Sequence, residues 1–129
     1  MTGQRYSLKQ AQAMLPEARE RAEQAGALVT DLQRLVEQLR SGTAPSGAVE
    51  EAASLEAEVE AIFGWFEAQS VQVKSLAPIL LDFPARAIRD GQAFDVLLCW
   101  RDDEPDIAYY HPPSGGYRAR EPVAMLDRV

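Results

Sequence analysis

The run Ser41-Gly42-Thr43-Ala44-Pro45-Ser46-Gly47 decides the fold, because the chain on either side of it is patterned as helix. This run is rich in turn formers and helix breakers, as is typical of a short connection between two helices. Before it, small and apolar residues recur at alternating spacings of three and four, at Leu15, Ala18, Ala22, Ala25, Val29, Leu32, Val36 and Leu39. A second stripe follows it, at Ala48, Ala52, Leu55, Val59, Ile62 and Phe66. Such spacings place the residues along one side of a helix, as in a coiled coil.

The two stripes predict a long antiparallel helical hairpin over residues 7–69, with coiled-coil-like packing. They are of similar length, and the short connection favours lengthwise contact between the two helices. Ser7 and Gln10 have the spacing of a capping box, which predicts the start of the first helix. Pro16 lacks an amide hydrogen and restricts the residue before it, so we expect the helix to kink or restart near Pro16. Gly64, inside the second helix, predicts a close backbone contact.

After Gln69 the hydrophobic period changes from helical to alternating, which predicts a small three-stranded antiparallel β-meander over residues 71–111. The strands are expected at residues 79–84, 94–100 and 107–111, with turns at 89–92 and 101–104. A two-residue turn at Asp102-Asp103 would set Leu98 opposite Ile107, a register that gathers apolar side chains on one face. We expect the aromatic end of the helical hairpin, where the second helix carries Phe63, Trp65 and Phe66, to cover this face. Residues 112–129 are predicted to be a loop and a tail.

Composition and charge limit the function classes. The predicted fold class is α+β, and 129 residues suit a single domain over 1–129. The formal net charge of −7 argues against binding to nucleic acid or to a membrane surface. The lone cysteine, Cys99, has no partner for an internal disulfide and favours a reducing compartment. With no signal segment and no membrane-spanning run, we expect a cytoplasmic protein.

Several short motifs stand out in the second half of the chain: Leu80-Leu81-Asp82-Phe83-Pro84-Ala85, Val96-Leu97-Leu98-Cys99-Trp100, Glu104-Pro105, Tyr110-His111, Gly116, Arg120 and Pro122. Together they resemble a bacterial family known only as domain of unknown function 2203. The opening Ser7-Leu8-Lys9-Gln10-Ala11 and the pair Leu15-Pro16 extend the resemblance to most of the chain. The family has no established activity, so the resemblance supports the predicted fold and implies no function.

The candidate metal ligands are Asp82 and His111. A carboxylate and an imidazole suit a divalent ion, and the two residues come together if the first and third strands converge. Glu104 lies seven residues from His111, roughly 23 Å along a strand, so these two cannot share one ion. The alternative is structural: Asp82 would form an ion pair with Arg86 or Arg120, and Glu104 a surface pair with Arg101. Cys99, in mid-strand, is expected to be a small apolar filler.

A candidate anion site lies in the loop that follows the third strand. Glycines expose backbone amides and arginines bind oxyanions in pairs, which makes Gly116, Arg118 and Arg120 candidate ligand-binding residues together with Asp82 and His111. A solvated loop without a ligand is the alternative.

The function that the sequence favours is a non-enzymatic protein-binding or assembly module. The helical hairpin has surface to spare, so we expect a homodimer through the hairpin, with a four-helix bundle at its centre, and a protein partner as a second use of that surface. This function needs no cofactor. The alternative is a metal- or anion-binding enzyme, using a divalent metal ion, with a site near Asp82, His111 and Arg120.

Overall fold

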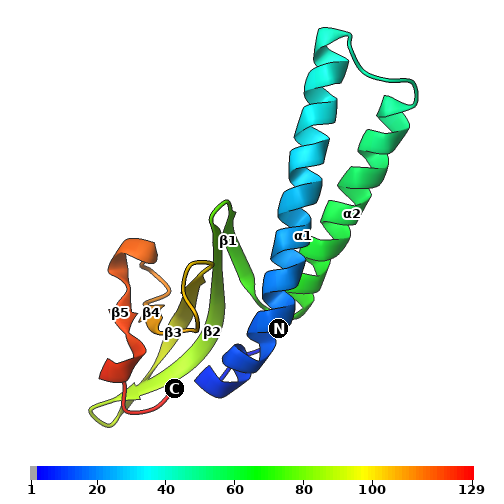
Figure 1. The fold of residues 1–129 in the computed structure, drawn as a ribbon. Helices are drawn as coiled ribbons and strands as arrows, with labels where there is room; N and C mark the ends of the chain where they lie inside the picture. Colours follow the sequence, from blue (N-terminus) through cyan, green and yellow to red (C-terminus); the bar gives the residue numbers. More distant parts are fainter. Residues whose placement is uncertain (1–2) are drawn as a thin grey trace.

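A computed structural model describes residues 3–129, so the first two residues of the predicted 1–129 domain lie outside the described part. The chain forms two long helices followed by an antiparallel sheet, which confirms the α+β class (Figure 1). The helices are α1 (Leu8–Ser41) and α2 (Ala48–Ala68). The sheet has five strands in chain order, β1 (Gln72–Leu76), β2 (Ile79–Arg89), β3 (Gln92–Arg101), β4 (Tyr109–His111) and β5 (Glu121–Pro122). Two single-turn 3-10 helices, η1 (Tyr117–Ala119) and η2 (Val123–Met125), flank β5.

Helix α1 begins at the predicted capping box. The Gln10 amide donates to Ser7 Oγ (3.1 Å), and the Ser7 amide donates to Gln10 Oε1 (2.9 Å). The helix then continues through Pro16 without a break, so no second helix starts there. The reason is tertiary packing: Ala11 before the proline and Ala18 after it are both fully buried in the same core, which outweighs one missing hydrogen bond.

The helices pack as an antiparallel hairpin, and the predicted stripes are confirmed only in part. On α1 the stripe is buried as far as Ala25, but Val36 and Leu39 are 38% exposed and Leu35 is buried in their place. Beyond Ala25 the sheet core no longer covers α1, so burial there follows only the side of the helix that faces α2. Gly64 is exposed, and a side chain Cβ at this position would have no neighbouring atom within 4 Å. The close backbone contact predicted there is therefore wrong.

One face of the sheet packs on the helices. The N-terminal half of α1 supplies Leu15 and four fully buried alanines, and α2 supplies Ile62 and Phe66. The alanines bring the helix backbone close to the strands. The aromatic end of the hairpin covers this face as expected, with Phe66 buried in the core, but Phe63 remains 37% exposed and α1 provides much of the cover.

The sheet has five strands because two segments outside the three predicted strands also pair. β1 forms a hairpin with β2, and β2 with β3 turns at Asp90-Gly91, where both residues have positive φ (52° and 77°). The region 112–129 is not a loop and tail: it contributes β5, and Arg128 bridges to Ile88 of β2. Local sequence does not mark this strand, because two residues are too few to show an alternating pattern.

The register of β4 differs from the prediction. The turn after β3 closes at residues 101–104, where the Glu104 amide donates to the Arg101 carbonyl (2.9 Å), but the strand does not restart there. Pro105 offers no amide hydrogen to a ladder, and the Ile107 amide donates to Gln12 Oε1 of α1 (3.2 Å). Leu98 therefore lies opposite Tyr110 rather than Ile107. A displacement of three residues, being odd, exchanges the two faces of the strand.

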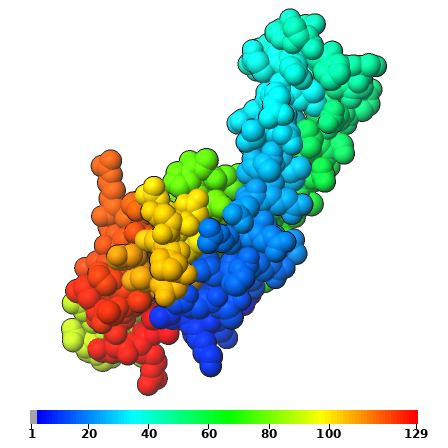
Figure 2. Space-filling view, viewed as in Figure 1, coloured from blue at the N-terminus to red at the C-terminus, as the bar shows by residue number. Residues whose placement is uncertain are grey.

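The distal half of the hairpin extends away from the sheet (Figure 1), and Figure 2 shows it standing apart from the rest of the molecule. The helix residues of the main core end at Ala25 on α1 and begin at Ile62 on α2, so this half relies on contacts between the two helices. Among the described residues, no helix is both long enough and apolar enough to cross a membrane.

Candidate functional site

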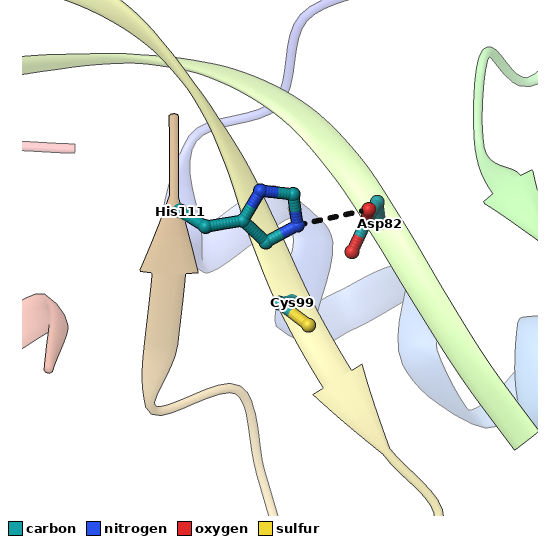
Figure 3. Close-up of side chains that lie close together, drawn as sticks. All are labelled: Asp82, Cys99 and His111. Atoms are coloured by element: carbon teal, nitrogen blue, oxygen red, sulfur yellow. Dashed lines mark hydrogen bonds and ion pairs between the residues drawn. The ribbon is translucent and has the colours of Figure 1, made fainter. Parts of the chain in front are cut away.

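Three buried side chains come together on the face of the sheet opposite the helices. Asp82, Cys99 and His111 lie on β2, β3 and β4, and Figure 3 shows Asp82 and His111 facing each other with Cys99 close by. Asp82 is paired directly with Cys99, and His111 is paired with Leu97, which places His111 diagonally across from Cys99. The side chains of Asp82 and His111 meet above the middle strand. The small Cys99 side chain beneath them leaves room for this contact.

Asp82 and His111 form a hydrogen-bonded pair that is shielded from water. Their side chains are each 2% exposed, and Asp82 Oδ2 lies 3.0 Å from His111 Nε2. His111 Nδ1 lies 2.8 Å from the Pro112 carbonyl oxygen, which can only accept, so Nδ1 carries a proton and donates it. Nε2 and Oδ2 then share one further proton. The pair is electrically neutral as a whole, whichever of the two atoms holds that proton.

Two further atoms of the site that could bind a metal, Asp82 Oδ1 and Cys99 Sγ, lack strong hydrogen-bond partners. Asp82 Oδ1 is buried and has no hydrogen-bond partner within the described residues. Cys99 is fully buried, and burial raises the pKa of its thiol to about 12, with the neighbouring Asp82 carboxylate adding to the effect. One ligand atom from each of Asp82, Cys99 and His111 lies within 4.8 Å of the others. A buried carboxylate oxygen without a partner is costly, and such atoms are concentrated at functional sites.

A cavity of about 200 Å³ adjoins the three residues. Its remaining lining comes from β1, β2 and the segment after β4: Lys74, Leu80, Gly115, Gly116 and Tyr117. Gly115 permits the tight fold of that segment, because a Cβ there would lie 2.9 Å from the Ala119 Cβ. The predicted loop thus closes over the cluster, and it brings Gly116 to the site.

Next to the cluster, Arg120 and Glu104 form a two-pronged ion pair. Arg120 Nη1 donates to Glu104 Oε1 (3.0 Å) and Nη2 to Oε2 (2.8 Å), with both side chains at most 15% exposed. The guanidinium lies between the rings of Tyr109 (4.2 Å) and Tyr117 (4.1 Å). Burial acts to lower the pKa of Arg120, but the hydrogen bonds and charge of Glu104 outweigh it and raise the pKa. The predicted surface pair between Glu104 and Arg101 is therefore wrong.

The amino-acid sequence agrees with one family of proteins. A family model described as "Uncharacterized conserved protein (DUF2203)" matches residues 4–123. The chain belongs to the DUF2203 family. No curated protein and no solved structure matches it significantly.

In this DUF2203 protein the predicted site residues fall into two groups. Asp82, His111 and Gly116 meet at the cavity, whereas Arg118 is exposed and does not line it. Arg120 lies between the groups: its Nη1 is 4.0 Å from Cys99 Sγ, but both terminal nitrogens are engaged by Glu104. An oxyanion would have to compete with Glu104 for this guanidinium. The expected ion pair of Asp82 with Arg86 or Arg120 is replaced by the pair with His111, and Arg86 lies 3.7 Å from Asp95.

Cys99 was expected to be an apolar filler, but it lies in the buried cluster with Asp82 and His111. The expected register would have placed His111 on the opposite face of the sheet from Cys99. The observed register places the two residues on the same face. The signal was present in the sequence, since Pro105 argued against a strand that restarts directly after the turn.

A larger groove of about 670 Å³ runs between the N-terminal segment, the end of α2 and the sheet of the DUF2203 protein. Its lining is mainly apolar, with Phe63, Val73 and Val96 among the contributors. Its carboxylate Asp95 lies near two arginines, Arg5 (3.3 Å) and Arg86 (3.7 Å). The groove lacks the convergent buried polar groups that mark a chemical site.

Proposed function

We propose that this protein is a non-enzymatic assembly module that forms a homodimer through its helical hairpin. The observation that carries the proposal is the distal half of the hairpin, which lies outside the main core and exposes apolar side chains. Val36 and Leu39 on α1 are 38% exposed and Val49 on α2 is 65% exposed. Two helices cover each other on one side only, and a second hairpin would cover the remaining apolar edge.

The size of the free surface supports a dimer of moderate strength. Residues 26–41 span about 24 Å at about 1.5 Å per residue, and two helices side by side are about 20 Å wide. One subunit would then contribute about 500 Å², so the whole interface reaches about 1,000 Å², the lower end for specific association. We expect the equilibrium between monomer and dimer to shift toward the dimer as the protein concentration rises.

Charge favours one arrangement of the two hairpins. Helix α2 carries six glutamates and neither lysine nor arginine, whereas the distal half of α1 is neutral, because Arg34 and Arg40 pair with Asp31 and Glu37. Two α2 helices side by side would repel each other, so α1 of one subunit is expected to lie against α2 of the other.

The oligomeric state tests the proposal. We expect the mass from sedimentation equilibrium to rise from monomer toward dimer across micromolar concentrations. The double variant Val36→Glu, Leu39→Glu places two carboxylates in the apolar edge and is expected to stay monomeric. Thr30→Glu is the matched control, because it adds a carboxylate at an exposed position of the same helix. A wild-type protein that stays monomeric throughout, or a double variant that still dimerises, would contradict the proposal.

The same proposal includes a cellular compartment and a class of partner. A lone, fully buried thiol suits a reducing compartment, so we place the protein in the cytoplasm. The acidic surface of α2 suits a protein partner better than nucleic acid or an anionic membrane. The dimer needs no cofactor. The alternative, a metal- or anion-binding enzyme around Asp82, His111 and Arg120, depends on whether the buried cluster binds a metal.

A further inference from the structure

We propose that Asp82, Cys99 and His111 form a site for a single Zn²⁺-type divalent ion, with its fourth coordination position open to the adjoining cavity. The three residues provide one carboxylate, one thiolate and one imidazole, a ligand set that suits zinc. They come from three neighbouring strands, which hold them more firmly than a loop would. The site is independent of the proposed dimer, because it lies on the sheet.

The spacing of the ligand atoms fits an ion with little rearrangement. Asp82 Oδ2 and His111 Nε2 are 3.0 Å apart. Two ligands at about 2.0 Å from a tetrahedral ion lie about 3.3 Å apart, so the ion would take the place of the shared proton. Cys99 Sγ lies within 4.8 Å of both ligand atoms, and a tetrahedral ion would bring it to about 3.5 Å from them, an inward movement of about 1 Å at most.

The histidine is already oriented as a metal ligand. Its Nδ1 donates to the Pro112 carbonyl (2.8 Å), which fixes the ring and directs Nε2 toward Asp82. Metal-binding histidines commonly donate their second ring nitrogen to a carbonyl or carboxylate in this way. Since Pro112 directly follows His111, the same short segment supplies both the ligand and the group that orients it.

Charge balance favours the same ion. Without metal, the Asp82–His111 pair with its shared proton and the Cys99 thiol are together neutral. With Zn²⁺ bound to a carboxylate, a thiolate and a neutral imidazole, the site is neutral again, and two protons have left. The nearby charge of Arg120 is balanced by Glu104, and Lys74, at the cavity wall, is exposed to solvent. A divalent ion therefore adds no net charge to the buried site.

The unpartnered oxygen is the independent sign that the site takes a ligand. Asp82 Oδ1 is buried beside the cavity without a hydrogen-bond partner within the described chain. A bound ion would satisfy it, either by two-oxygen coordination or through a water molecule in the fourth position. The cavity of about 200 Å³ has room for that water.

Cobalt binding tests the proposal on the full chain without a histidine tag. We expect the reduced protein to bind one equivalent of Co²⁺, to show a thiolate-to-cobalt charge-transfer band in the near ultraviolet, and to release the cobalt when Zn²⁺ is added. Cys99 is the only cysteine in the chain, so such a band can come from no other residue. Cys99→Ala is expected to lose the band, and Asp82→Asn to weaken binding by about 100-fold or more.

The control separates this site from surface carboxylates. Asp95→Asn makes the same chemical change at a half-exposed position on β3 and is expected to bind Co²⁺ as tightly as the wild type. Circular dichroism verifies the fold of each variant, and the wild-type protein alone already decides the main point. A folded wild type that takes up no Co²⁺, or takes it up without the thiolate band, overturns the proposal.

Discussion

Cys99 combines a polar setting with a thiol that keeps its proton. It sits on the middle strand between an acid and a histidine, is fully buried, and its pKa rises from 9.0 to about 12, chiefly because of burial. A thiol in this state is a poor nucleophile. Such a thiol is poorly suited to covalent catalysis, and it would have to give up its proton to bind the proposed ion.

This raised pKa predicts how stability depends on pH in the metal-free protein. In the unfolded chain the Cys99 thiol loses its proton near pH 9.0, whereas in the folded chain it keeps the proton to about pH 12. Between these values the unfolded state binds fewer protons than the folded state, so the free energy of unfolding falls as the pH rises. Below pH 9.0 the contribution is complete.

Denaturant unfolding of the wild type and of Cys99→Ala checks this prediction, at about pH 8 and at about pH 10. The wild type is expected to lose more stability between the two conditions than the variant, which has no thiol to ionise. The tyrosines titrate in the same way in both proteins, so their contribution to the stability change cancels in the comparison. Equal losses would show that the thiol ionises freely in the folded state.

The sequence predicted that Asp82 and His111 could meet if their strands converge, and the structure meets this condition. The place of Cys99 in the cluster was missed, because it depends on a register that the local pattern of apolar residues did not identify. Apolar residues occupy both faces of β3, with Leu97 and Leu98 both buried, so the pattern favoured neither register decisively. Hydrogen bonds to distant residues, such as Gln12, settled it.

At the scale of elements, the ion pair of Glu104 and Arg120 joins the turn after β3 to the C-terminal segment. Glu104 Oε1 also accepts from the Arg101 amide (2.8 Å), so the carboxylate fixes the turn and the arginine at once. This contact explains why residues 112–129 are ordered against the sheet, although their sequence is typical of a loop. Long-range pairing of this kind leaves no periodic signal, and the prediction failed there for that reason.

Replacing Arg120 tests this link between elements. Arg120→Ala leaves Glu104 nearly buried without its charge partner, and we expect it to lower the free energy of unfolding by about 2–3 kcal/mol. Arg118→Ala, two residues earlier and exposed, is the matched control and is expected to cost less than about 0.5 kcal/mol. Urea denaturation measures both. Similar costs for the two variants would mean that the ion pair does not hold the segment.

At the scale of the whole molecule, the chain divides its apolar residues unequally. The sheet and the near halves of the helices share one core, in which Phe66, Phe83 and Trp100 are almost completely buried. The far half of the hairpin buries Leu35 and Ala48 but lies outside that core. The hairpin itself was predictable, because the two stripes and the breaker run are local features. The unequal burial was not, since it depends on where the sheet meets α1.

This unequal burial predicts that the far half of the hairpin is locally less stable than the sheet, and that the difference becomes smaller as the protein concentration rises. Amides between about residue 30 and residue 58 have little core behind them, so at low concentration we expect them to exchange hydrogen faster than those of β2 and β3. Dimerisation through the hairpin would protect these amides as the concentration rises and leave the sheet unchanged. Hydrogen–deuterium exchange followed by mass spectrometry measures both regions in one experiment. The Val36→Glu, Leu39→Glu variant should show fast exchange in the hairpin at every concentration. If exchange in the wild-type hairpin does not slow as the concentration rises, no second copy covers the exposed edge.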